Sequence, residues 1–264
     1  MDTPIAEVSG HRGAQPSAVR LSDSGGNGAS GDLQLSTELL SYVAASEAAP
    51  RLIRVYRPKP TLAFSRRESY LPGFASALTA AASYGFTPVI RLTGGRAVPY
   101  DQSCLLIDVV EPVTRRHEGN QAAFEGAAQA LAGALRALGV DAFVGEVAGE
   151  YCPGAYSVNA RRKVKLVGIS QRVIPGARLI SAMIPVGDPG VLVEVLTAVN
   201  HELAFSWRPE TFGSVAGEVA GVSFADVSVA IQDAFSPNGA EEMPYHQFAS
   251  QYRALRLTPF CDGA

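Results

Sequence analysis

The stretch Val164–Val186, VKLVGISQRVIPGARLISAMIPV, contains two apolar runs on either side of the dipeptide Pro175-Gly176. Because proline and glycine are typical of turns, the stretch predicts two strands, Val164–Val173 and Leu179–Val186, joined by a short connection. A hairpin-like pair of strands set between helical segments indicates an α+β fold.

Helical and strand-like patterns alternate along the rest of the chain. The most regular helical pattern covers Glu118–Leu138, where apolar residues recur at three- and four-residue steps before Gly139. Further helices are predicted over Leu33–Ala45, Pro72–Tyr84 and Val191–Leu203, and after a Ser223 cap; further strands are predicted over Arg51–Tyr56, Thr61–Ser65, Phe86–Arg91, Cys104–Val110 and Val140–Glu146.

The domain boundary is predicted from composition. The chain has 264 residues, 47% of them apolar, which is enough for one sizeable core. The glycine- and serine-rich stretch Ser22–Gly31 predicts that residues 1–31 form a disordered tail. Residues 32–264 are therefore expected to form a single domain, a mixed β-sheet packed with helices.

Charge, hydropathy and cysteine usage exclude several classes of function. The net charge is −3 without a basic block, which argues against nucleic acid as the main partner. No run of eighteen apolar residues is present, so no membrane span is expected. The three cysteines form no CxxC pair and the four histidines lack metal-ligand spacing. We expect no metal and a reducing cytoplasm as the compartment.

Cys152 and Lys165 are the candidate catalytic pair. Cys152 lies in the proline/glycine turn Tyr151–Tyr156, which puts its thiol on a loop. A thiolate is a nucleophile, and a nearby ammonium can stabilise it and polarise a carbonyl, so the pair indicates acyl transfer. The alternative for Cys152 alone is a structural loop thiol, and for Lys165 alone structural and functional roles are equally supported.

A second candidate segment is the glycine loop after the strand that ends at Arg91. Gly94 and Gly95 allow the main chain to approach a ligand, and their amides can face an anion or a carbonyl oxygen. Taken alone, the pair would more simply form a tight turn, with Arg91 and Asp101 forming a salt bridge across it. The segment lacks the Walker A and GxGxxG patterns, so nucleotide binding does not follow.

Taken in order, two motifs make the chain resemble the lipoate–protein ligase A and octanoyltransferase superfamily, related in fold to biotin–protein ligases. Arg91–Asp101, RLTGGRAVPYD, is similar to the family's Arg-x-x-Gly-Gly-x-Ala-Val-x-His-Asp motif. Lys165–Arg172, KLVGISQR, is similar to its Lys-(hydrophobic)-x-Gly-x-(Ala/Ser)-Gln-Arg motif. The resemblance implies a biotin/lipoate protein ligase-like fold of the class II aminoacyl-tRNA synthetase type.

The cysteine loop most resembles the octanoyl amidotransferase branch, which moves an octanoyl group from the carrier GcvH to other lipoyl domains through an acyl-cysteine. This resemblance implies that Cys152 is the nucleophile and that Lys165 contacts the acyl carbonyl. It implies lipoyl domains of GcvH-like proteins and of E2 subunits of 2-oxoacid dehydrogenases as partners, octanoyl or lipoyl as the group moved, and no cofactor. The expected substrate-binding residues are Arg91, Thr93, Gly94, Gly95, Arg96, Ala97, Gly168 and Ser170, with an acyl slot near Ile90, Leu105–Ile107 and Val167–Ile169.

Two departures from the family pattern leave alternatives open. Tyr100 replaces a histidine typical of the ligases, and Arg96 replaces their third glycine. The first alternative is an ATP-dependent lipoate–protein ligase that forms an acyl-adenylate with the glycine loop and Lys165. The second is a non-catalytic module that binds an acyl group or a lipoyl domain.

Overall fold

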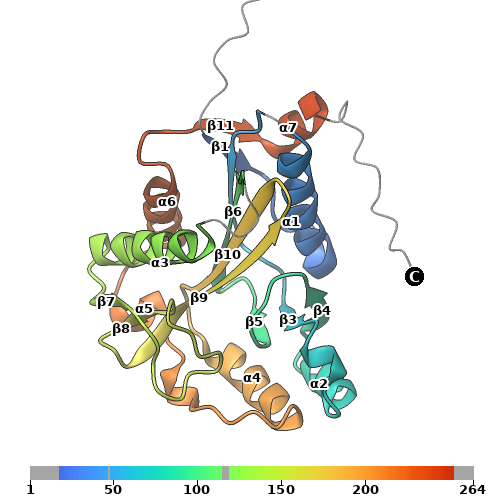
Figure 1. Cartoon of the computed structure of the whole chain (residues 1–264). Helices are drawn as coiled ribbons and strands as arrows, with labels where there is room; N and C mark the ends of the chain where they lie inside the picture. The colour runs from blue at the N-terminus through green and yellow to red at the C-terminus, as the bar shows by residue number, and fades with distance from the viewer. Residues whose placement is uncertain (1–17, 47, 115–118, 253–264) are drawn as a thin grey trace, which may run out of the picture.

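The structure is a computed structural model that describes residues 18–46, 48–114 and 119–252 (Figure 1). Its strands are β1 (Ala18–Ser22), β2 (Arg51–Tyr56), β3 (Thr61–Ser65), β4 (Thr87–Arg91), β5 (Val98–Tyr100), β6 (Cys104–Pro112), β7 (Ala142–Val144), β8 (Val158–Ala160), β9 (Val164–Ile174), β10 (Ala177–Pro185) and β11 (Glu241–Pro244). Its helices are α1 (Gly28–Ala45), α2 (Phe74–Ser83), α3 (Asn120–Ala137), α4 (Gly190–Glu202), α5 (Val215–Glu218), α6 (Phe224–Phe235) and α7 (Tyr245–Tyr252), with 3₁₀ turns at Glu68–Tyr70 and Pro209–Thr211.

Within these residues the strands form two sheets. The larger has eight strands in the order β11-β1-β2-β6-β10-β9-β8-β7, and the smaller has three in the order β4-β3-β5. The larger sheet is mixed, because β1 pairs parallel with β2 and β11 whereas β6, β9 and β10 pair antiparallel. The predicted strand pair around Pro175-Gly176 is therefore confirmed as the β9–β10 hairpin, and the predicted α+β fold is confirmed with it.

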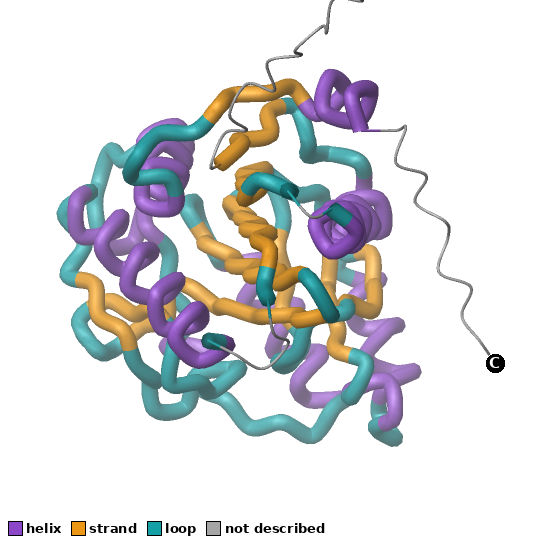
Figure 2. Tube along the Cα trace, turned by 45° about the horizontal axis from the view of Figure 1, so that its top comes forward, coloured by secondary structure: helices purple, strands orange, loops and turns teal. Residues whose placement is uncertain are grey.

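Helices cover both faces of the larger sheet (Figures 1 and 2). On one face α3 and α6 bury apolar side chains against β6, β9 and β10 in one core cluster. On the other face α1 packs Leu35, Leu39 and Val43 against Leu52 and its neighbours in a second cluster. The smaller sheet forms a third cluster with α2 and α4. These layers leave space between α1, the smaller sheet and the β9–β10 hairpin, and the candidate site lies there.

The predicted boundary of the disordered tail is wrong for residues 18–31. Strand β1 lies between β2 and β11 in the larger sheet, and α1 begins at Gly28. The fully buried guanidinium of Arg54 orders this segment, because it donates to the Ser24 carbonyl at 2.7 and 3.0 Å and to Asp32 Oδ1 at 2.6 Å. Composition could not indicate these long-range bonds. The rest of the predicted tail, residues 1–17, lies outside the described residues.

The helices of the described residues are too short or too polar to cross a lipid bilayer.

Candidate active site

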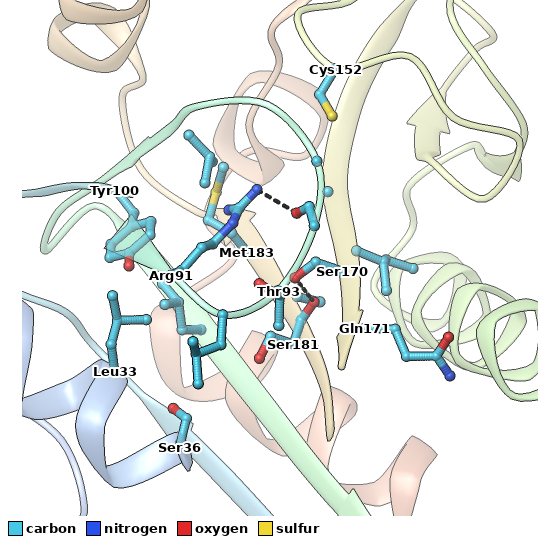
Figure 3. Close-up of a pocket in the computed structure, with 18 of the residues that line it drawn as sticks. Leu33, Ser36, Arg91, Thr93, Tyr100, Cys152, Ser170, Gln171, Ser181 and Met183 are labelled. Atoms are coloured by element: carbon cyan, nitrogen blue, oxygen red, sulfur yellow. Dashed lines mark hydrogen bonds between the residues drawn. The ribbon is translucent and has the colours of Figure 1, made fainter. Parts of the chain in front are cut away.

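A cavity of about 760 Å³ brings the two predicted motifs and the cysteine loop together (Figure 3). Its volume lies within the range of small-molecule sites, roughly 300–1,000 Å³. The walls come from α1, the segment from β4 to β5, the loop that carries Cys152, and the β9–β10 hairpin. Cys152 and Lys165 both line it, so the two residues predicted to act together do face one cavity.

Arg91 stabilises the conformation of the glycine loop through hydrogen bonds to its main chain. Its Nη2 donates to the carbonyls of Gly94 and Arg96, each at 2.8 Å. The predicted salt bridge between Arg91 and Asp101 is wrong, because Asp101 Oδ1 instead accepts from the main-chain N–H of Ser103 at 2.7 Å and from its hydroxyl. The arginine thus fixes the main chain of the loop between Gly94 and Arg96.

A buried carboxylate, Glu68, ties the end of this loop to the smaller sheet. Glu68 Oε1 accepts from the Ala97 N–H at 2.6 Å, and Oε2 accepts from the N–H and hydroxyl of Ser65 at 2.7 and 2.9 Å. Ala97 is fully buried in the core of the smaller sheet and does not line the cavity. Its predicted place in the substrate wall is therefore wrong, and its contribution is an N–H that anchors the loop.

The glycine loop presents an amide to the candidate nucleophile. The main-chain N–H of Arg96 donates to Cys152 Sγ at 3.3 Å. The Cys152 side chain is half-buried at the cavity wall. A main-chain donor aimed at sulfur can stabilise negative charge there, which is the chemistry that a cysteine nucleophile needs.

Lys165 contacts the main chain of Cys152 instead of its sulfur. Lys165 Nζ donates to the Cys152 carbonyl oxygen at 2.6 Å and forms an ion pair with Glu150 Oε1 at 3.1 Å. The ammonium also lies 4.7 Å from the centre of the Tyr151 ring. Because its side chain is only 4% exposed, Lys165 is a buried anchor for the cysteine loop.

Glu150 is a site residue that the sequence did not indicate. Its side chain is fully buried, and it accepts from Lys165, from the Ser157 hydroxyl at 2.7 Å and from the Val147 N–H at 3.2 Å. The only available signal was its position next to Tyr151 and Cys152. The partner of Glu150 is fifteen residues further along the chain, and only the tertiary structure pairs the two.

The other predicted binding residues line the cavity: Arg91, Thr93, Gly94, Gly95, Arg96, Gly168 and Ser170. Of the residues predicted to wall an acyl slot, Ile90, Leu106, Gly168 and Ile169 line the cavity. The prediction is wrong for Leu105, Ile107 and Val167, which belong to the core cluster under α3 and α6. Successive residues of a strand face opposite sides of a sheet, which is why Leu106 lines the cavity while its neighbours Leu105 and Ile107 pack in the core.

The two departures from the family pattern have distinct positions. The guanidinium of Arg96 lies 4.4 Å from the centre of the Phe205 ring and donates to the Tyr151 carbonyl at 3.4 Å. Arg96 therefore links the glycine loop to the cysteine loop. Tyr100 is 5% exposed and lines the cavity, and burial raises the pKa of its hydroxyl above the ordinary value, so this group stays protonated.

Gly95 provides a test of how tightly the loop and the sulfur are coupled. Its φ is +100°, and a Cβ there would lie 2.9 Å from Arg91 Nη2 and 3.4 Å from Cys152 Sγ. We expect Gly95→Ala to lower the unfolding free energy by about 1–3 kcal/mol and to change the rate at which iodoacetamide alkylates Cys152. Gly94→Ala is the matched control, because a Cβ there meets nothing within 4 Å. Equal unfolding free energies for the two variants would contradict this geometry.

Among the described residues no group of three or more histidine, cysteine, aspartate or glutamate side chains could hold a metal ion.

With the fold and the cavity defined, the family can be stated. Residues 31–235 match the model of the lipoyl protein ligase A/B catalytic domain. The chain belongs to this family. The match spans both motifs, the cysteine loop and the helices that enclose the cavity, so the superfamily predicted from the sequence is confirmed.

Among curated proteins the chain is similar to octanoyl-[GcvH]:protein N-octanoyltransferases. It is 28% identical to the enzyme of Geobacillus kaustophilus over 58% of this chain and 53% of that protein. It is 34% identical to the enzyme of Exiguobacterium sibiricum over 61% of this chain and 53% of that protein. The chain thus spans about half the length of the curated relatives it matches.

Solved structures confirm the fold. A Thermoplasma acidophilum protein with bound lipoic acid has a TM-score of 0.69 at 22% identity, over 90% of this chain and 94% of that one. Lipoate-protein ligase A bound with ATP has a TM-score of 0.62 at 22% identity, over 84% of this chain and 88% of that one. The chain therefore has the fold of lipoate protein ligases.

Proposed function

We propose that this protein is an acyltransferase of protein lipoylation that moves an octanoyl or lipoyl group through acyl-Cys152 to a lysine of a lipoyl domain. The single observation that carries the proposal is the Cys152 sulfur at the cavity wall, 3.3 Å from the Arg96 amide. The relatives named octanoyl-[GcvH]:protein N-octanoyltransferase suggest GcvH as the carrier that donates the acyl group. An E2 lipoyl domain, described with an archaeal lipoate protein ligase, suggests the acceptor.

The reaction divides into two acyl transfers. In the first, Cys152 sulfur attacks the carbonyl carbon of the acylated lysine on the donor. The C–S bond forms, the C–N bond breaks, and the released lysine amine takes up a proton. In the second, the neutral lysine amine of the acceptor attacks the thioester carbonyl carbon, the C–N bond forms and the C–S bond breaks. Cys152 leaves as thiolate, and the proton lost by the amine passes to the solvent.

The chain's own residues act on this reaction in three ways. The Arg96 amide stabilises negative charge on sulfur before attack and after release. Lys165 holds the Cys152 carbonyl at 2.6 Å, so the nucleophile is fixed with respect to the glycine loop. The apolar part of the cavity binds the acyl chain, with each buried methylene contributing about 0.8 kcal/mol. Cys152 must be reduced to accept the acyl group, which fits a reducing cytoplasm.

The test is intact-protein mass spectrometry after incubation with octanoyl-GcvH. We expect a mass increase of one octanoyl group, located on the Cys152 peptide, with and without ATP. Subsequent addition of an unmodified lipoyl domain should discharge the adduct and acylate that domain.

Two outcomes would contradict the proposal. Pyrophosphate release from ATP that depends on lipoate, without an adduct on Cys152, would identify a ligase. Binding of octanoyl-GcvH with neither an adduct nor pyrophosphate release would identify a binding module.

A further inference from the structure

A row of polar side chains crosses the floor of the cavity. Arg54 of β2 pairs in register with Asp108 of β6, Asp108 pairs with Ser181 of β10, and Ser181 pairs with Ser170 of β9. These residues lie on neighbouring strands, and Asp108, Ser181 and Ser170 line the cavity. Polar residues side by side across four strands are unexpected in a slot for a plain alkyl chain.

The polar row lies beyond the part of the cavity next to the candidate nucleophile. The preceding row, two residues along each strand, contains Leu106, Met183 and Gly168. A Cβ on Gly168 would lie 3.0 Å from the Tyr151 hydroxyl, so this apolar row adjoins the cysteine loop. Two residues of a strand span about 7 Å, so an acyl chain attached to Cys152 crosses the apolar row before its far end reaches the polar row.

Hydrogen bonds connect the side chains of the polar row into one cluster. Asp108 Oδ2 accepts from Ser36 Oγ of α1 at 2.6 Å and from Arg54 Nη1 at 3.2 Å, and Oδ1 accepts from Ser181 Oγ at 2.5 Å. Arg54 also pairs with Asp32 at 2.6 Å. One guanidinium therefore serves two buried carboxylates, and the cluster carries a net negative charge.

The side chains of Tyr56, Tyr100 and Thr93 lie around this cluster, and among the described residues their hydroxyls have no hydrogen-bond partner. All three residues line the cavity. Figure 3 shows Cys152 at one end of the view and Ser36 at the other, with Thr93, Ser181 and Tyr100 between them. Since these hydroxyls border the cavity and are not used by the protein itself, they can bond to a ligand placed there.

We infer that the end of the cavity away from Cys152 binds a hydroxyl group of the acyl chain, so that this enzyme prefers a medium-length acyl group hydroxylated at or near its far end. The inference rests on the proposed function. A hydroxyl can donate to the lone pairs of Ser181, whose own proton goes to Asp108, and can accept from a tyrosine hydroxyl. A terminal carboxylate fits poorly beside the negative cluster, and a methyl group leaves the tyrosine and threonine hydroxyls unpaired.

The experiment measures binding of free acids to the full chain by titration calorimetry. The probes are octanoic acid, 8-hydroxyoctanoic acid and octanedioic acid, which share eight carbons. We expect 8-hydroxyoctanoic acid to bind about ten-fold more tightly than octanoic acid, which corresponds to one or two net hydrogen bonds. Octanedioic acid is expected to bind more weakly than 8-hydroxyoctanoic acid.

Substitutions of cavity residues test whether the polar row causes the preference for the hydroxylated acid. Ser181→Ala and Tyr100→Phe should each reduce the preference for the hydroxylated acid several-fold. Because the two substitutions lie on different elements, the test remains possible if one of the variant proteins fails to fold. The matched controls are Ser41→Ala, whose hydroxyl donates only to the Thr37 carbonyl, and Tyr84→Phe at an exposed position. Both controls should keep the wild-type preference.

Equal affinities for octanoic and 8-hydroxyoctanoic acid, tighter binding of octanedioic acid, or an unchanged preference in both test variants would overturn the inference. These results are separable from the fate of the proposed function. Formation of an octanoyl adduct on Cys152 without a hydroxyl preference would contradict only the inference. A hydroxyl preference without any adduct on Cys152 would contradict only the proposed acyl transfer.

Discussion

Replacing Cys152 by serine is expected to abolish the acyl adduct and to slow transfer by roughly a thousand-fold or more. The described hydrogen-bond partner of Sγ is the Arg96 N–H, which is a donor. Such a donor stabilises an anion but cannot remove a proton from a serine hydroxyl, which is almost fully protonated at neutral pH. The measurement is acyl transfer from octanoyl-GcvH to a lipoyl domain, followed by mass spectrometry of both proteins.

Cys104→Ala is the matched control for this variant. Cys104 begins β6 and is fully buried, and burial raises the pKa of its thiol to about 12. A thiol that is neither exposed nor ionised cannot act as the nucleophile, so the Cys104 variant should retain the adduct. Normal transfer by Cys152→Ser would remove Cys152 from the mechanism.

Lys165→Met is expected to have the largest effect on stability, lowering the unfolding free energy by about 3–5 kcal/mol. The side chain of Glu150 is fully buried, and removal of its cation leaves a buried carboxylate without a counter-charge. The exposed neighbour Lys163 is the matched control, and Lys163→Met should change the unfolding free energy by no more than about 0.5 kcal/mol. Denaturant unfolding of the variants measures both effects.

A double variant separates the two roles of Lys165. In Lys165→Met/Glu150→Gln no buried charge is left unpaired, so most of the lost stability should return. Activity should remain about a hundred-fold low, because the bond to the Cys152 carbonyl is still missing and the sulfur is no longer held in place. Recovery of full activity together with stability would show that Lys165 has a purely electrostatic role in the fold.

The long elements of the fold could be predicted from the sequence. The helix α3 and the β9–β10 hairpin have clear periodicity and turn residues, and each is found within a few residues of its predicted bounds. The strands β5, β8 and β11 have three or four residues each and were missed. A segment this short contains too few residues for an alternating pattern, and its pairing with neighbouring strands makes it a strand.

Most of the candidate site could also be predicted, because motifs with several residues in fixed order are informative. The contacts that these residues make could not be predicted. Lys165 was expected to face the thiol, and instead it contacts the Cys152 carbonyl and Glu150. The polar row with Asp108 was not anticipated, although an aspartate within the apolar run of β6 was a visible signal.

By itself the sequence determined the α+β class, the family and the identity of the cysteine, lysine and glycines at the site. These properties depend on local periodicity and on residue types at fixed spacing, both of which are properties of the chain. The tertiary structure alone decided which atom each side chain contacts, which half of each strand faces the cavity, and that Arg54 orders the segment near Ser24. Those outcomes depend on strand register and on bonds between residues far apart in the chain, which no local pattern contains.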